Sequence, residues 1–150
     1  MVCHGGGSFR GVSALKPRSF AYEVAVDRDG LISAEDDEYV DVGDEWTADH
    51  LLLAAVVRCS IASLRFHARR TGVDATAAGT ATGTVTKPAG EERFRFVSIA
   101  ATIDAELDPE PDPEALAGLL ETAERDCFVG ASLVTKPAYR WRVNGQTVRP

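Results

Sequence analysis

The sequence predicts an α+β fold in which a largely antiparallel sheet surrounds one long central helix. Strand-like and helix-like segments come in runs and do not strictly alternate, which is typical of this class. Apolar residues recur at helical spacing over residues 48–70, between segments that alternate like strands. The expected order is βββ-α-ββ-α-β. A length of 150 residues suits one domain.

The N-terminal part is expected to be a tail followed by three strands. Residues 1–18 are rich in Gly and Ser, which predicts a flexible tail, and residues 19–150 are expected to form the domain. Residues 20–26 alternate between apolar and polar side chains and predict a strand. Asp29-Gly30 predicts a hairpin turn into a second strand at residues 31–34. A third short strand is expected at residues 39–42.

The central helix is predicted from its end signals as well as its period. Thr47 is a plausible N-cap, and Asp49 places negative charge in the first turn. Gly72 follows Arg69 and Arg70, a pattern typical of a helix C-terminus. At about 23 residues the helix would be roughly 35 Å long. Small side chains leave room for a second helix to approach it: Ala54, Ala55, Ser60, Ala62 and Ser63.

The C-terminal part is expected to supply two strands, a helix and a last strand. Residues 76–86, rich in Thr and Ala, predict an edge-like strand, and residues 94–107 a long one. Residues 114–126 predict the second helix, residues 128–133 a turn or short helix, and residues 139–143 the last strand.

Composition excludes several kinds of partner. The net charge of −7 argues against nucleic-acid binding, which needs clustered positive charge. The longest apolar run, residues 51–57, is far shorter than the ~20 residues of a membrane span, and the N-terminus lacks a signal-peptide core. We therefore expect a cytoplasmic protein without nucleic-acid or membrane partners.

The sequence carries no strong metal or cofactor signal. It has no CxxC or HExxH motif, and His50 and His67 lie too far apart on one helix to share a metal. We expect no metal and no cofactor. The three cysteines form an odd set, which does not indicate a disulfide scaffold. Cys59 and Cys127 each follow a nearby arginine, and composition leaves open whether they are buried hydrophobic residues or reactive thiols.

A family resemblance favours reactive thiols. The segment TADHLLLAAVVRCSIASLRFHARRTGV, residues 47–73, resembles the central helix of the OsmC/Ohr family of thiol peroxidases. The block AERDCFVGASLVTKPAYRW, residues 123–141, resembles that family's second cysteine helix and final strand. The spacing between Cys59 and Cys127 also fits. The resemblance extends from about Phe20 to Asn144.

The resemblance implies a thiol peroxidase acting on organic hydroperoxides. Cys59 matches the cysteine that attacks peroxide and becomes a sulfenic acid, and Cys127 matches the one that condenses with it to a disulfide. A dithiol, such as a lipoylated protein, would then reduce the disulfide. Arg28 matches the arginine that activates the first thiol. Asp49 stands where the family has the Glu that holds this arginine.

Other positions depart from the family pattern. Ala48 and Phe128 replace prolines, and Gly130 stands where a serine is usual. The departures at Asp49 and Phe128 keep open an OsmC-like binding or interaction protein without turnover. A hotdog-like thioesterase, which also wraps a sheet around a long helix, is a second alternative. Cys3, in the expected tail, should be dispensable.

Helix geometry and the resemblance together predict a homodimer. Asp49 and Cys59 lie ten residues apart, roughly 15 Å along one helix and about 80° apart around it. Either the helix breaks near Leu51 or the site joins two chains, as in the family's interlocked dimers. The substrate pocket is expected to be apolar. Its candidate walls are Tyr39, Trp46, Phe66 and Phe128.

Overall fold

The computed structural model describes residues 19–35 and 37–148. Contacts divide the chain into an N-terminal unit that ends at Gly43 and a second unit that begins at Asp44. The expected tail, residues 1–18, lies outside the described residues, and a single domain over residues 19–150 stays a prediction.

The N-terminal unit contains a β-hairpin. Strands β1 (Val24–Val26) and β2 (Ile32–Ala34) pair antiparallel. The Asp27 carboxylate organises the turn, because its Oδ1 accepts the backbone N–H of Asp29 and of Leu31, both at 2.9 Å. Gly30 has a φ of 84°, which a glycine adopts readily. The predicted hairpin at Asp29-Gly30 is confirmed, although β1 is shorter than expected.

The third expected strand does not form among these residues. Val40 makes one isolated antiparallel bridge to Ile32, and no strand continues along residues 39–42. The Asp41 carboxylate accepts the backbone N–H of Gly43, and Gly43 has a φ of 75°. This local turn diverts the backbone immediately after the bridge.

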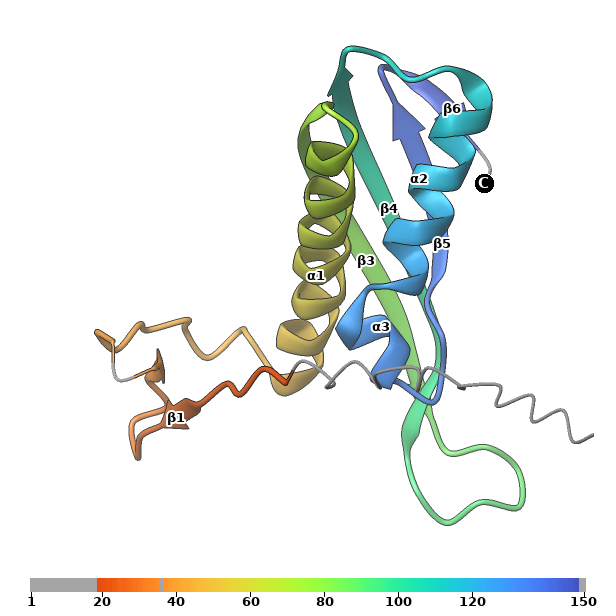
Figure 1. The fold of residues 1–150 in the computed structure, drawn as a ribbon. Coiled ribbons are helices and arrows are strands. Elements are labelled where there is room, and N and C mark those ends of the chain that lie inside the picture. Colours follow the sequence, from red (N-terminus) through yellow and green to blue (C-terminus); the bar gives the residue numbers. More distant parts are fainter. Residues whose placement is uncertain (1–18, 36, 149–150) are drawn as a thin grey trace, which may run out of the picture. The chain divides into compact units, whose positions relative to one another are not determined.

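The second unit is a four-stranded sheet with helices on one face (Figure 1). Its strand order is β3-β4-β5-β6, and every neighbouring pair is antiparallel except β4 with β5. The expected α+β class and largely antiparallel sheet are therefore confirmed. The elements are α1 (Ala48–Arg70), β3 (Asp74–Thr86), β4 (Arg95–Asp108), α2 (Pro113–Arg125), α3 (Phe128–Ser132), β5 (Ala138–Val143) and β6 (Gln146–Val148).

Helix α1 is continuous over its 23 residues and begins and ends where the sequence indicates. The backbone N–H of Thr47 donates to Nδ1 of His50 at 3.3 Å, and Gly72 has a φ of 77° just after the helix. Two glycines let α1 lie close to β3. A Cβ at Gly79 would be 3.0 Å from a methyl of Val57, and one at Gly83 would be 3.1 Å from a methyl of Leu53.

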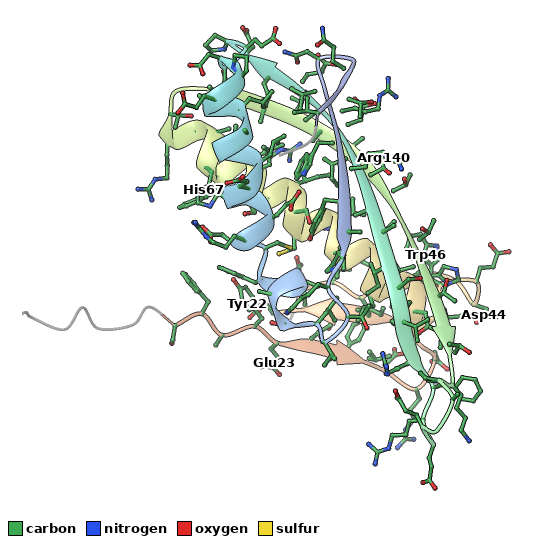
Figure 2. The ribbon with its side chains drawn as sticks, turned by 90° about the vertical axis from the view of Figure 1, so that its right-hand side faces the viewer. Tyr22, Glu23, Asp44, Trp46, His67 and Arg140 are labelled. Atoms are coloured by element: carbon green, nitrogen blue, oxygen red, sulfur yellow. The ribbon has the colours of Figure 1, made fainter. Side chains whose placement is uncertain are left out.

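The core lies between the helices and the inner face of β4 and β5. Strand β4 alternates, with every second residue from Ile99 to Leu107 buried. Helix α2 contributes an apolar stripe. The largest fully buried side chain is Trp141 of β5, whose indole N–H donates to the Glu124 carboxylate at 2.7 Å. Arg140, its neighbour, points away from the helices (Figure 2).

Strand β6 was not expected from the sequence. It follows a turn at Asn144-Gly145, where both residues have positive φ values of 48° and 80°. The Asn144 side chain also holds the turn against β4, because its Oδ1 accepts the Leu107 N–H at 2.9 Å. The element order is therefore ββ-α-ββ-αα-ββ within the described residues.

By length and composition alone, α1 is apolar enough to cross a membrane, and it is the one helix among the described residues that meets this test. The core helix of a water-soluble protein can meet the same test. Here α1 contacts β3, β4, α2 and α3. Only 28% of its most apolar window is buried within one chain, so much of its apolar surface lacks cover from this chain.

Candidate active site

The two cysteines expected to act together come from different elements of the second unit and meet. Cys59 lies midway along α1 and is half-buried. Its sulfur accepts the backbone N–H of Val129 in α3 at 3.5 Å. Cys127 is the N-cap of α3 and is fully buried. Both are free thiols.

Two contacts near the site fix the segment that carries Cys127. His67 Nε2 of α1 lies 3.0 Å from the Asp126 carboxylate, just before Cys127, and Figure 2 shows His67 on the side of α1 that faces α2. After α3, the Lys136 ammonium donates to the Ala131 carbonyl at 2.6 Å. The first contact holds the start of α3 to α1, and the second holds the end of α3 to the segment before β5.

The surroundings of the two sulfur atoms differ. Burial raises the pKa of the Cys59 thiol, and the neighbouring Cys127 raises it further, while the Val129 N–H partly opposes the rise. Burial also acts to raise the pKa of Cys127. Hydrogen bonds with the Ser60 hydroxyl, the Gly130 N–H, Cys59 and Tyr139 act together against burial, so the pKa of Cys127 is lowered overall.

The sequence placed Ser60 among the small residues of the central helix and gave no functional signal for Tyr139. Ser60 is fully buried, and its Oγ lies 2.8 Å from the Val56 carbonyl, 3.5 Å from the Cys127 sulfur and 3.2 Å from the Tyr139 hydroxyl. Burial raises the pKa of Tyr139 to about 12, so its phenol is protonated at neutral pH. The available signal was a serine at helical spacing between two buried apolar residues, Val56 and Leu64.

The structure does not test the expected role of Arg28. It lies in the turn between β1 and β2, in the N-terminal unit. Two other arginines lie near the cysteines in sequence. Arg125 is paired with Asp126, with Nε 2.8 Å from Oδ1, and Arg58 is exposed on α1. The activation of Cys59 by Arg28 stays a prediction.

Asp49 cannot reach Cys59 along its own helix. It is exposed in the first turn of α1, and α1 does not break near Leu51. The first of the two alternatives, a broken helix, is therefore excluded. If Asp49 acts at a Cys59 site, the second alternative remains, in which the carboxylate comes from another chain.

The four aromatic residues expected to line the substrate pocket are all exposed. Phe66 lies two helical turns after Cys59 on the same face of α1, and the Arg70 guanidinium lies 5.6 Å from its ring centroid. Trp46 precedes α1 and meets the His50 ring edge-on. Phe128 begins α3, and Tyr39 belongs to the N-terminal unit. Their role as pocket walls stays a prediction.

Among the residues that the structure describes, no group of three or more His, Cys, Asp or Glu side chains is arranged to hold a metal ion. The chemistry available at the paired cysteines is that of thiols: nucleophilic attack, oxidation to a sulfenic acid and disulfide formation.

A mixed sheet with a long helix, carrying two neighbouring thiols on α1 and α3, defines an α+β protein with a paired-cysteine site. The family model of OsmC-like proteins matches residues 41–141. The chain therefore belongs to the OsmC-like family. No curated protein matches the chain in sequence.

Solved structures share the fold at low sequence identity. An OsmC-like protein from Mycoplasma pneumoniae is 13% identical, with a TM-score of 0.61, over 86% of this chain and 98% of its own. The organic hydroperoxide resistance protein OhrB of Bacillus subtilis is 15% identical, with a TM-score of 0.53, over 83% and 98%. A putative organic hydroperoxide resistance protein from Vibrio cholerae, with captopril bound in one active site, is 18% identical, with a TM-score of 0.60, over 88% and 96%. These likenesses show the fold.

Proposed function

We propose that the protein is a thiol peroxidase that reduces organic hydroperoxides to alcohols. The observation that carries this proposal is the meeting of Cys59 and Cys127, which lie far apart in the sequence but interact as free thiols. Membership of the OsmC-like family and the likeness to organic hydroperoxide resistance proteins support a peroxidase-like role.

The proposed cycle has three steps. The Cys59 thiolate attacks the outer peroxide oxygen; the O–O bond breaks, the alkoxide leaves and takes a proton to become an alcohol, and Cys59 becomes a sulfenic acid. Cys127 then attacks the Cys59 sulfur and releases water, forming the disulfide. A dithiol reduces the disulfide through a mixed disulfide, restoring both thiols and becoming a cyclic disulfide itself.

The first step needs a thiolate at Cys59, and burial within one chain raises the pKa of this thiol. A nearby guanidinium would lower it. In our proposal Arg28 supplies this charge and Asp49 positions the arginine. Because Asp49 cannot reach Cys59 along a continuous helix, the carboxylate comes from the second chain of a homodimer.

An apolar substrate suits the side chains around Cys59 better than hydrogen peroxide does. Phe66 and Phe128 lie near the two cysteines in sequence and expose apolar surface, and Trp46 lies at the start of α1. In the proposed dimer these side chains would contact the organic group of the hydroperoxide. A cytoplasmic location stays part of the proposal.

One observation favours a second candidate, an OsmC-like binding protein without turnover. Within the second unit the thiol expected to be the nucleophile has a raised pKa, and Asp49 and Phe128 depart from the family pattern. The OsmC-like family match speaks against the hotdog-like thioesterase.

Thiol counting separates the two candidates. The reduced protein would be mixed with one equivalent of cumene hydroperoxide, and its thiols titrated before and after. A peroxidase loses two thiols per chain within one turnover and regains both on addition of dihydrolipoamide. An unchanged thiol count would reject the peroxidase and leave the binding protein.

A further inference from the structure

Beneath the paired cysteines lies a buried group of hydroxyls that the proposed cycle has not used. Ser60 belongs to α1 and Tyr139 to β5, and both reach Cys127 at the start of α3. Three elements therefore converge on one sulfur atom. Ser60 and Cys127 are fully buried, and Tyr139 is half-buried.

The two hydroxyls have fewer hydrogens than there are acceptors around them. Ser60 and Tyr139 carry one hydroxyl hydrogen each. The acceptors are the Val56 carbonyl, the Cys127 sulfur and the two hydroxyl oxygens themselves. The Val56 carbonyl, at 2.8 Å, is the shortest contact of Ser60 and is a bond that a serine commonly makes within a helix. When Cys127 is neutral, that contact satisfies Ser60.

Ionisation of Cys127 changes which acceptor is strongest. A thiolate attracts a hydroxyl hydrogen more than a carbonyl does, because charged acceptors make stronger hydrogen bonds. Rotation about the Cβ–Oγ bond would turn the Ser60 hydrogen from Val56 to the sulfur without moving a heavy atom. Tyr139, 3.2 Å from the Ser60 oxygen, can then donate to it or to the sulfur itself.

Gly130 makes room for this arrangement. Its backbone N–H donates to the Cys127 sulfur at 3.4 Å. A Cβ at position 130 would lie only 2.9 Å from the Tyr139 hydroxyl and 3.4 Å from that sulfur. A side chain there would displace the Tyr139 hydroxyl, so the glycine and the tyrosine fit together.

Other ionisable groups around Cys127 come from each packed element. Cys59 faces it from α1. Burial raises the pKa of Tyr139 and keeps the phenol protonated, and the charge of Glu124 in α2 adds to this effect. Lys136 lies beyond α3, 3.4 Å from the Gly130 carbonyl. The Ser60 hydroxyl and the Gly130 backbone N–H donate to the Cys127 sulfur.

We infer that Ser60 and Tyr139 form a hydroxyl relay that receives the negative charge of Cys127, so that Cys127 is the sulfur expelled when a dithiol opens the Cys59–Cys127 disulfide. This inference rests on the proposed function, because it requires that disulfide. Ser60 and Tyr139 are positioning residues that act through Cys127.

The order in which bonds form and break follows from the exposure of the two cysteines and from the stabilisation of the thiolate that leaves. Cys59 is half-buried and Cys127 is 0% exposed, so an external thiolate reaches the Cys59 sulfur. It forms a mixed disulfide with Cys59, and the electron pair of the broken S–S bond goes to Cys127, where the relay stabilises it. The second thiol of the dithiol then attacks the external sulfur and releases Cys59.

The test uses the full chain with Cys3→Ser, oxidised by diamide and opened by 2-mercaptoethanol. After an acid quench, peptide mass mapping should find the mercaptoethanol adduct on Cys59. Ser60→Ala should slow opening by about tenfold, since a hydrogen bond to a charged group commonly contributes that much. Tyr139→Phe should slow it less. Ser63→Ala is the matched control, because Ser63 lies on the same helix and its buried hydroxyl has no partner among the described residues.

A second readout needs neither peroxide nor a disulfide. In the Cys3→Ser/Cys59→Ser protein, ultraviolet thiolate absorbance would be followed against pH to titrate Cys127. Ser60→Ala should move the midpoint upward by about one pH unit, and Ser63→Ala should leave it unchanged.

The outcomes separate the relay from the proposed function. A mercaptoethanol adduct on Cys127 would overturn the relay. The relay is also overturned if Ser60→Ala and Tyr139→Phe leave the titration midpoint of Cys127 unchanged while circular dichroism shows that both variants are folded. Failure of diamide to form the disulfide overturns both the expulsion step and the proposed cycle, even if the titration still shifts. A slowed opening and a shifted titration without peroxide consumption would support the relay and reject the peroxidase.

Discussion

The residues around each sulfur atom distinguish the two cysteines, whose sequence contexts are similar. Cys59 is half-buried with the backbone N–H groups of Val129 and Phe128 at its sulfur, whereas Cys127 is fully buried beside the Ser60 hydroxyl and the Gly130 N–H. The resemblance of the two cysteine segments to the OsmC/Ohr family predicted that the two would meet. It could not predict the partners of each sulfur, because Ser60 and Tyr139 reach Cys127 only through the packing of α1, α3 and β5.

The first prediction concerns the roles of the two cysteines. Cys59→Ser should abolish peroxide consumption because it removes the nucleophile. Cys127→Ser should still consume about one equivalent of peroxide and then stop as a sulfenic acid, detectable with a dimedone probe. Cys3→Ser should keep full activity. A Cys127→Ser protein as inactive as Cys59→Ser in a single turnover would contradict this assignment.

The second prediction concerns the activation of Cys59. Burial raises the pKa of this thiol, and a guanidinium counteracts burial by favouring the thiolate. Arg28→Ala should therefore move the pH profile of iodoacetamide alkylation at Cys59 to higher pH and slow peroxide reduction below that pH. Arg125→Ala is the control, since Arg125 is already paired with Asp126. An unchanged pH profile for Arg28→Ala would contradict this role of Arg28 and make Arg58 the next arginine to test.

At the scale of elements, end signals and periodicity predicted most of the second unit. Thr47, Asp49 and Gly72 gave the limits of α1, and the long strand expected at residues 94–107 corresponds to β4. Strand β6 was missed although Asn144-Gly145 is a strong hairpin signal. The third N-terminal strand was wrong because apolar alternation over a few residues does not decide between a strand and a single bridge.

The glycines in β3 indicate close packing by another element, which hydrophobic periodicity does not reveal. A glycine within a strand often marks a close approach by another element, and here that element is α1. A Cβ at Gly79 would come within 2.8 Å of the Thr102 carbonyl oxygen and of the Ile103 side chain, besides the nearby Val57 methyl. Backbone atoms cannot yield as easily as the end of a flexible side chain.

The third prediction tests this close packing. Gly79→Ala should destabilise the fold by roughly 1–3 kcal/mol, as overpacked core substitutions do. Gly118→Ala is the matched control: the position lies in α2 with open space around a new Cβ, so alanine should stabilise the helix by up to about 1 kcal/mol. Urea unfolding measures both. Equal effects of the two substitutions would contradict the packing argument.

At the scale of the whole molecule, much of the apolar surface of α1 is not covered by its own chain. Seven consecutive apolar residues, 51–57, point in every direction around the helix. Within the chain β3 and α2 cover part of it, and only 28% of the most apolar window is buried. Asp49, one end of the proposed site, also cannot reach Cys59 in its own chain. A second copy would meet both needs.

The fourth prediction is therefore a homodimer with a shared site. Ala55→Arg should split the dimer or unfold the chain, because a guanidinium cannot enter a contact between small side chains. Ala115→Arg, on the exposed face of α2, is the control. Sedimentation gives the mass and circular dichroism the fold.

Mixing variants tests the shared site directly. Cys59→Ser protein, which should be inactive, and Arg28→Ala protein, which should be slow, would be unfolded together and refolded as a mixture. If Arg28 serves the partner chain's cysteine, each mixed dimer regains one complete site, which restores about a quarter of all sites in a two-fold dimer. If both residues serve their own chain, mixing restores nothing. A fully active monomer at micromolar concentration would contradict both the dimer and the shared site, since α1 would then be stable without a second copy to cover it.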